Sequence, residues 1–212
     1  RIAQLTYNER NALGDGCMEP DDRGLTSYGR QSVQEMNRLG ICVDLSHVGE
    51  KTSLDATRYS TKPVIYSHAN PKAVGPGKRN ITDQQMKDMA ATGGVMGISA
   101  HSMLCHKTPG VQPTVDDMMD MFDYAIDLIG IDHVAIGSDV YESFTKLSWE
   151  SMTKRWYPTG FVFETMRAQG FSAVSEFPNV TRGLVSRGYS DEEIAKVLGG
   201  NWLRLFGEVW AA

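Results

Sequence analysis

Three short apolar segments of this sequence end in side chains that can bind a metal ion. Two of the segments end in the dipeptide Ser-His, at His47 and at His68, and the third, residues 134–137, leads through Ser138 to Asp139. Imidazole nitrogens and carboxylate oxygens are ligands that zinc uses in proteins. In parallel barrels, the side chains at the carboxyl ends of the strands form the active site. The sequence therefore predicts a divalent-metal site where these three segments end.

The two Ser-His pairs support each other as metal ligands. A single buried histidine is more often held by an ordinary hydrogen bond, but His47 and His68 would end neighbouring strands about 5 Å apart, which is close enough to share one zinc ion. Asp139 is open to three interpretations, as a metal ligand, a general base or a cap of the following segment. Asp44 lies inside its strand, where it would support a ligand or form an internal ion pair.

The remaining candidate side chains give weaker signals. His101 follows the fourth apolar segment and is a candidate for contact with a substrate, whereas His106 lies farther along the same loop and is expected to be solvated. His133 precedes its segment, so we expect it at the opposite end of the sheet, in a structural role. Arg79 follows a glycine-rich loop, and its guanidinium group suits a substrate carboxylate. Spacing alone would make Arg79 an ordinary surface residue.

Composition places the chain among ordinary globular proteins. Its 212 residues are 41% hydrophobic and 22% charged, with a formal net charge of -5, so a single domain covering 1–212 is expected. No long run of one charge suggests a nucleic-acid or membrane surface. Three cysteines without a C-x-x-C spacing argue against disulfides and a cysteine zinc site. No leader pattern or membrane span is recognised, and a cytoplasmic location is favoured.

The elements that must position the candidate side chains alternate between strands and helices. Strands are expected near residues 2, 41, 64, 95 and 134, with helices between them and a closing set of helices after residue 178. This alternation predicts βαβ units and a parallel sheet. No G-x-G-x-x-G follows a strand, so a dinucleotide site is disfavoured. A (β/α)8 barrel needs eight strands, and five would form about its second half. Residues 140–177 are expected to cover the mouth.

Several motifs together resemble the membrane (renal-type) dipeptidases, a family of binuclear zinc peptidases. The resemblance rests on stretches in the family's order: GLTSYGR at 24–30, EMNRLG at 35–40, DLSH at 44–47, SHAN at 67–70, RNITD at 79–83, GIDHV at 130–134, GSD at 137–139 and GGNWLR at 199–204. It implies an α/β fold, the (β/α)8 TIM barrel of the metal-dependent hydrolases, with this chain covering about the last five strands. The implied activity is hydrolysis of dipeptides by a hydroxide that bridges two zinc ions.

The resemblance also implies a role for each candidate residue. His47 and His68 match the two histidines on one zinc ion, and Asp139 matches the carboxylate that binds the other and handles the proton. Arg79 matches the residue that holds the terminal carboxylate of the substrate. Tyr7 stands where the family has a histidine that binds the scissile carbonyl oxygen. A tyrosine hydroxyl can donate the same kind of hydrogen bond.

One part of the family pattern is absent from this sequence. The first half of the family carries a His-x-Asp pair and a glutamate that bridges the metals, and no His-x-Asp occurs in this chain. The chain is therefore expected to be the C-terminal portion of a metallo-dipeptidase, completed by a missing N-terminal half or by homo-oligomerisation. Two alternatives remain open. One is a related metal hydrolase acting on another amide or ester, and the other is an inactive fragment or binding module.

Overall fold

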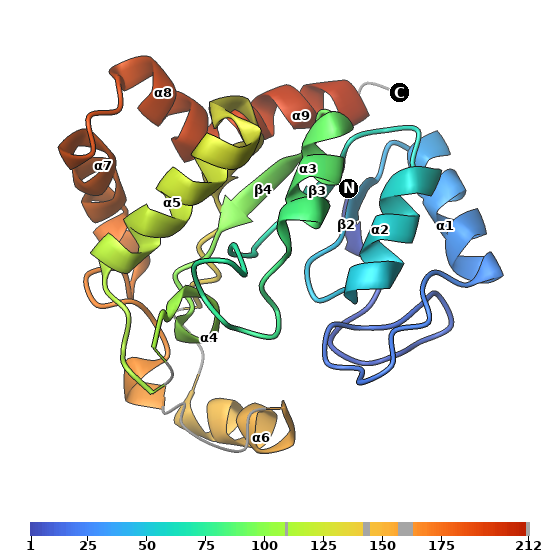
Figure 1. Ribbon diagram of the computed structural model, residues 1–212, viewed down its shortest axis with the longest axis horizontal. Helices are drawn as coiled ribbons and strands as arrows, with labels where there is room; N and C mark the ends of the chain where they lie inside the picture. The colour runs from blue at the N-terminus through green and yellow to red at the C-terminus, as the bar shows by residue number, and fades with distance from the viewer. Residues whose placement is uncertain (109, 142–144, 157–162, 211–212) are drawn as a thin grey trace.

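The structure of the protein is a computed structural model. It describes residues 1–108, 110–141, 145–156 and 163–210 (Figure 1). Part of the segment 140–177, which was expected to cover the mouth, lies outside these residues. Within that segment, helix α6 (Lys146–Trp156) lies beyond the carboxyl ends of the strands.

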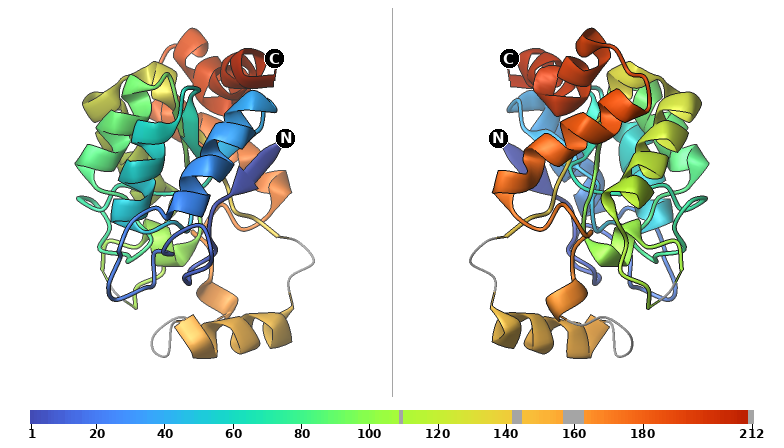
Figure 2. Two further views of the ribbon diagram at one scale, coloured as in Figure 1. Left: turned by 90° about the vertical axis from the view of Figure 1, so that its right-hand side faces the viewer. Right: turned by 90° about the vertical axis from the view of Figure 1, so that its left-hand side faces the viewer.

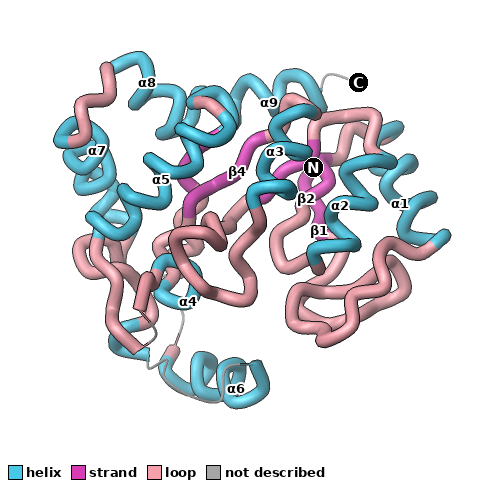
Figure 3. The backbone as a smooth tube through the Cα atoms, in the orientation of Figure 1, coloured by secondary structure: helices cyan, strands magenta, loops and turns pink. Residues whose placement is uncertain are grey.

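A parallel sheet forms the centre of the chain (Figure 3). Its strands lie side by side in sequence order: β1 (Ile2–Gln4), β2 (Cys42–Asp44), β3 (Val64–Tyr66), β4 (Val95–Ile98) and β5 (Val134–Ile136). Each neighbouring pair is parallel. The five predicted parallel strands are therefore confirmed, and all five carboxyl ends meet at one edge. Closure of this sheet into an eight-stranded barrel stays a prediction.

The longer helices between the strands are α1 (Ser27–Arg38), α2 (Glu50–Tyr59), α3 (Asp83–Ala91) and α5 (Val115–Ile129). All except α2 begin at a threonine that caps them. Thr82 and Thr114 each form a capping box at a helix start, which satisfies amide groups that have no partner within the helix. Gly130 ends α5 with a φ of 86°, a left-handed conformation that costs glycine little.

One face of the sheet is covered by these helices, which pack side by side in front of it (Figure 1). Their buried residues and the strand residues facing them form the main hydrophobic core, as Val43, Tyr66, Met96 and Ile136 illustrate. Successive strand residues point to opposite faces. The intervening residues of each strand therefore need a different cover.

The opposite face of the sheet is covered at its amino end by helix α9 (Asn201–Trp210). Leu205 and Val209 of this helix pack against one residue from each of four strands: Cys42, Ile65, Val95 and Ala135. Cys42 is thus a core residue. Figure 2 shows α9 close to the start of the chain, where the Trp210 indole donates to the Arg1 carbonyl. The other helices near the end are α7 (Phe177–Ser186) and α8 (Asp191–Ala195).

Helix α9 is expected to contribute strongly to stability through its buried side. Replacing Leu205, which is fully buried, with alanine should lower the free energy of unfolding by about 2–5 kcal/mol, because the apolar contacts are lost and a cavity remains. Leu203 on the same helix is 75% exposed, so Leu203→Ala is the matched control. Denaturant unfolding of both variants measures the difference, and equal effects would contradict this packing role.

A helix that crosses a bilayer needs about 20 mostly apolar residues. Among the residues that the structure describes, no helix is both long and apolar enough to cross a membrane.

Candidate functional site

The two histidines predicted as metal ligands meet at the carboxyl edge of the sheet. His47 follows β2, His68 follows β3, and their Nε2 atoms lie 3.0 Å apart with ring centroids separated by 5.0 Å. At zinc–nitrogen distances of about 2.05 Å, two nitrogens this far apart would subtend an angle of about 94° at the ion. The pair therefore fits two of the ligands of one metal ion.

Both imidazoles are held from behind through Nδ1. The Nδ1 atom of His47 lies 2.8 Å from the Asn8 amide oxygen, and that of His68 lies 2.8 Å from the Ser67 hydroxyl. Ser67 in turn donates to the Asp44 carboxylate over 2.6 Å. Of the two roles considered for Asp44, this is the supporting one, and Asp44 makes no ion pair within the described part of the chain.

The surroundings keep both histidines neutral. Burial, followed by the charge of Arg79, lowers the pKa of His68 to about 3 and also lowers that of His47. A neutral imidazole is the form that binds a metal ion. The electrostatics of the pair thus agree with its geometry.

Asp139 lies beyond the end of β5, on the third predicted segment. It is partly buried, and burial raises the pKa of its carboxyl group although the charge of Arg79 opposes this. The hydroxyl of Tyr141 donates to it. Among the described residues, no three His, Cys, Asp or Glu side chains come together in a metal-holding group. The roles of Asp139 as a ligand and proton carrier therefore stay predictions.

Backbone strain is concentrated around these side chains. In the part of the chain that the structure describes, the non-glycine residues with positive φ are Asn8 (63°), His47 (64°) and Asp139 (56°). Side chains rarely adopt this conformation, and it persists where the surroundings enforce it, often at functional sites. The three strained residues are two candidate ligands and the partner of one of them.

Arg79 is a buried cation with one hydrogen-bond donor that has no partner in the described part of the chain. Its side chain reaches the backbone of His68, where Nη2 donates to the His68 carbonyl at 3.4 Å. The residue is only 8% exposed, and its buried Nε has no partner among the described residues. An unpaired buried donor on a charged group is costly. This site therefore favours an anionic ligand.

Tyr7 lies on the outer side of His47. The two rings stack with centroids 4.1 Å apart, and Tyr7 remains 52% exposed. Burial of its other part raises the pKa of the hydroxyl, against the opposing charge of Arg79. The hydroxyl thus remains a proton donor in hydrogen bonds at neutral pH.

The other three histidines have different surroundings. His101 is buried at the start of helix α4 (Ser102–Cys105), where Nδ1 accepts from Met103 at 3.3 Å, and its contact with a substrate stays a prediction. His106 was expected to be solvated, and this is wrong, because it is buried with Nδ1 at 2.8 Å from the Ser102 carbonyl. His133 lies 2.8 Å from the Gly94 carbonyl at the amino end of the sheet.

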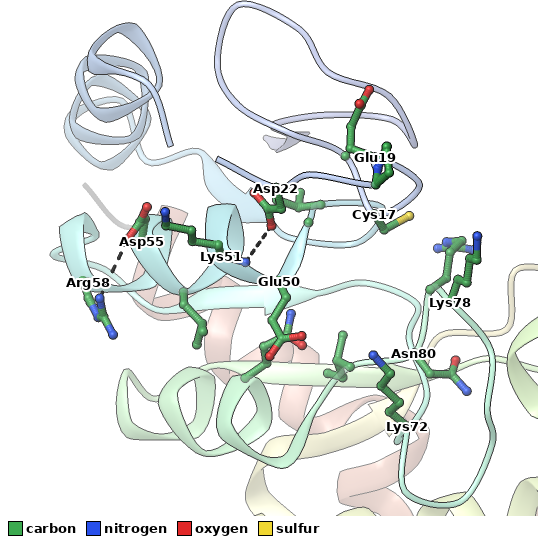
Figure 4. A pocket seen from close by; sticks show the side chains of 18 residues that line it. Cys17, Glu19, Asp22, Glu50, Lys51, Asp55, Arg58, Lys72, Lys78 and Asn80 are labelled. Atoms are coloured by element: carbon green, nitrogen blue, oxygen red, sulfur yellow. Dashed lines mark hydrogen bonds and ion pairs between the residues drawn. The ribbon is translucent and has the colours of Figure 1, made fainter. Parts of the chain in front are cut away.

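Beside Arg79 a cavity of about 490 Å³ opens between α2 and two loops (Figure 4). Lys72 and Lys78 lie along one side of it, and Glu50 projects from the start of α2. The histidine pair does not line this cavity, but Arg79 and Cys17 do. The sequence interpretation missed this cavity because its walls come from separate loops.

Asn8 is the site residue that the sequence interpretation overlooked. The signal that could have found it is its position a few residues past β1, at the same edge as the histidines.

Close packing of the strand ends depends on two glycines. A Cβ atom added to Gly137 would lie only 2.1 Å from the Ser67 carbonyl oxygen, and one added to Gly97 would lie 2.4 Å from it. Larger residues would push away the strand end that carries His68.

Gly137→Ala is accordingly expected to lower the free energy of unfolding by about 1–3 kcal/mol, as overpacked sites do. Gly207 is an exposed residue of α9, and a Cβ atom added there would have nothing within 4 Å. It supplies the control, since Gly→Ala in a helix should stabilise slightly. Denaturant unfolding measures the free energy of unfolding of both variants. An unchanged value in Gly137→Ala would mean that the strand ends are less tightly packed than described.

Comparisons with known proteins agree on one family. The family model described as "Membrane dipeptidase (Peptidase family M19)" matches residues 1–154 and 160–212. Dipeptidase tcpJ of Claviceps purpurea is 33% identical over 211 residues, which cover 99% of this chain and 44% of that protein. Dipeptidase aclJ of Aspergillus oryzae is 30% identical, with 99% and 45% covered. The chain thus spans a little under half the length of these curated relatives.

Solved structures show the same fold. An amidohydrolase from Pseudomonas aeruginosa is 36% identical with a TM-score of 0.89, covering 100% of this chain and 65% of its own. A metallo peptidase from Rhodobacter sphaeroides, solved with a phosphinate mimic of the dipeptide L-Ala-D-Ala, is 27% identical with a TM-score of 0.81, covering 99% and 56%.

Proposed function

The chain belongs to the membrane dipeptidase family, peptidase family M19, and from this premise we propose that the protein is a zinc-dependent dipeptidase. The recognised substrate would be a dipeptide with a free terminal carboxylate. The main support is one arrangement of side chains: the Nε2 atoms of His47 and His68 meet at 3.0 Å beside the buried Arg79, whose Nε has no described partner. Metal and carboxylate binding would then occur next to each other.

The residues that would hold metal are on three strand ends. His47 and His68 would bind one ion and Asp139 the second, with the remaining ligands expected from a part of the protein that this chain does not supply. When bound, zinc would provide a Lewis acid and an activated water molecule. The distance between the two Nε2 atoms supports the shared ion of His47 and His68.

The other site residues would act on the substrate directly. The guanidinium of Arg79 would bind the terminal carboxylate in a charge-assisted hydrogen bond and so orient the dipeptide. The Tyr7 hydroxyl, beside the His47 ring, would donate to the oxygen of the scissile carbonyl. Asp139, whose carboxyl pKa is raised by burial, would accept a proton and return it to the leaving amine. The dipeptide mimic bound to the Rhodobacter sphaeroides relative supports this substrate class.

A second candidate function is hydrolysis of another amide or ester by the same site. It is favoured by the amidohydrolase from Pseudomonas aeruginosa, which has the higher TM-score, 0.89. Arg79 would have a carboxylate to bind in N-acyl amino acids, as in dipeptides, but none in lactones.

The test uses the full-length protein with a panel of dipeptides, N-acyl amino acids and lactones. Dipeptide hydrolysis that stops after chelation and returns with zinc would support the proposal. Turnover of lactones or N-acyl amino acids without dipeptides would support the second function. A protein that binds no metal and turns over none of the panel would be the inactive alternative.

A further inference from the structure

We propose that Asn8 and the Ser67–Asp44 pair are positioning residues, which hold the proton of each imidazole on Nδ1 and so direct both Nε2 lone pairs at one metal ion. The inference rests on the proposed metal-dependent function and adds to it the residues that prepare the ligands. Neither group would touch the metal or the substrate. Each would act through the histidine in front of it.

The side-chain amide of Asn8 determines which ring nitrogen of His47 carries the proton. An amide oxygen accepts hydrogen bonds and does not donate them, so the 2.8 Å contact places the proton on Nδ1 of His47. The same oxygen lies 3.4 Å from the Cys17 sulfur, whose thiol is a donor. Two donors directed at one atom fix the amide with its oxygen toward the ring.

Asn8 is itself held in place by the backbone around it. It is buried and left-handed, with a φ of 63°, a conformation that asparagine tolerates better than most residues. Its carbonyl accepts from the Met18 amide at 3.0 Å. A Cβ on Gly16 would lie 2.2 Å from that carbonyl, so the returning loop packs directly against it. The oxygen that faces His47 thus has a rigid support.

A chain of hydrogen bonds that starts at Asp44 determines which ring nitrogen of His68 carries the proton. This buried carboxylate accepts from the Ser46 and Ser67 amides, both at 3.0 Å, and from the Ser67 hydroxyl at 2.6 Å. Because the Ser67 hydroxyl gives its only proton to Asp44, its oxygen is left as an acceptor for Nδ1 of His68 at 2.8 Å. The proton of His68 therefore lies on Nδ1 as well.

The positions of these protons decide what the Nε2 atoms of the two rings present to each other. With both protons on Nδ1, the two Nε2 atoms present lone pairs to each other at 3.0 Å, which is repulsive unless a positive charge lies between them. A metal ion supplies that charge, and outer partners of this kind orient ligand rings and raise their basicity. Two separate supports, one from the loop after β1 and one from β2 and β3, arrive at the same arrangement.

The test compares four variants of the full-length protein. Asn8→Gly keeps the left-handed backbone but removes the acceptor, whereas Asn8→Asp keeps both. Ser67→Ala removes the hydroxyl, and Ser67→Thr restores it. Competition with a chelator should show zinc affinity about 10–100-fold weaker in Asn8→Gly and Ser67→Ala, and close to that of the unaltered protein in Asn8→Asp and Ser67→Thr.

A second readout separates positioning from a general loss of structure. In zinc-loaded protein with ¹⁵N-labelled histidine, NMR should show two Nδ1-bound protons protected from exchange. Asn8→Gly should remove protection only at His47, and Ser67→Ala only at His68. Unchanged zinc affinity in both variants would overturn the positioning role alone. Protons found on Nε2 would contradict metal binding through those atoms as well. An unaltered protein that binds no zinc would overturn the proposed function and this role together.

Discussion

Replacing His68 with alanine is expected to weaken zinc binding by about 10²–10³-fold. Zinc held by three or four ligands has a binding free energy of roughly 10–16 kcal/mol, so one lost ligand should cost about 3–4 kcal/mol, at 1.4 kcal/mol per tenfold change. Dipeptide hydrolysis should fall with zinc occupancy. Chelator competition on full-length protein measures the affinity, and circular dichroism shows whether the fold is kept.

His133 provides the control for this prediction. It is also a histidine next to a strand, but its Nδ1 lies 2.8 Å from the Gly94 carbonyl at the amino end of the sheet, so His133→Ala should leave zinc affinity unchanged. If His68→Ala and His133→Ala weaken zinc binding equally, the ion is not held at the carboxyl edge.

Arg79→Gln is expected to lower kcat/KM by about 100-fold for dipeptides with a free terminal carboxylate. Removing one partner from a buried charge pair costs about 2–5 kcal/mol, and the neutral side chain cannot replace the ion pair. Arg79→Lys should show a smaller loss, of about tenfold and mainly in KM, because it keeps the charge without the planar fork. The same dipeptides as C-terminal amides should be affected much less.

The neighbouring Lys78 gives a matched control for charge alone. It lies in the same loop and lines the same cavity but is exposed, so Lys78→Ala should leave kcat/KM within a factor of about three, as expected for a screened surface charge. Arg79→Gln affecting amides and free dipeptides to the same extent would mean that Arg79 supports the fold and does not select the carboxylate.

The positions of the strand ends could be predicted because the spacing of apolar residues and the turn-forming residues between them are local signals in the sequence. Short apolar runs at 43–45 and 64–66 sit between helical patterns, and a parallel sheet brings their ends to one edge. That reasoning led to His47 and His68 without knowledge of the fold. It could not give the orientation of the rings, because Asn8 comes from another strand end and depends on a left-handed backbone.

His106 shows where local signals fail. It comes after Leu104 and Cys105 but precedes polar residues in a loop, and loop residues usually lie at the surface. In the structure, α4 is buried along its whole length, and its last turn places His106 against the Ser102 carbonyl. This burial comes from packing of the loop against the rest of the fold, which no spacing pattern records. The cavity beside Arg79 was missed for the same reason.

The most direct test of a metal site at the carboxyl edge is a crystal structure of the full-length protein, with anomalous scattering recorded on both sides of the zinc absorption edge. The expected result is a zinc peak about 2.0–2.1 Å from Nε2 of both His47 and His68, with Asn8 and Ser67 behind the rings. A zinc-loaded, active protein whose anomalous peaks lie elsewhere, with the two Nε2 atoms free of metal, would contradict it.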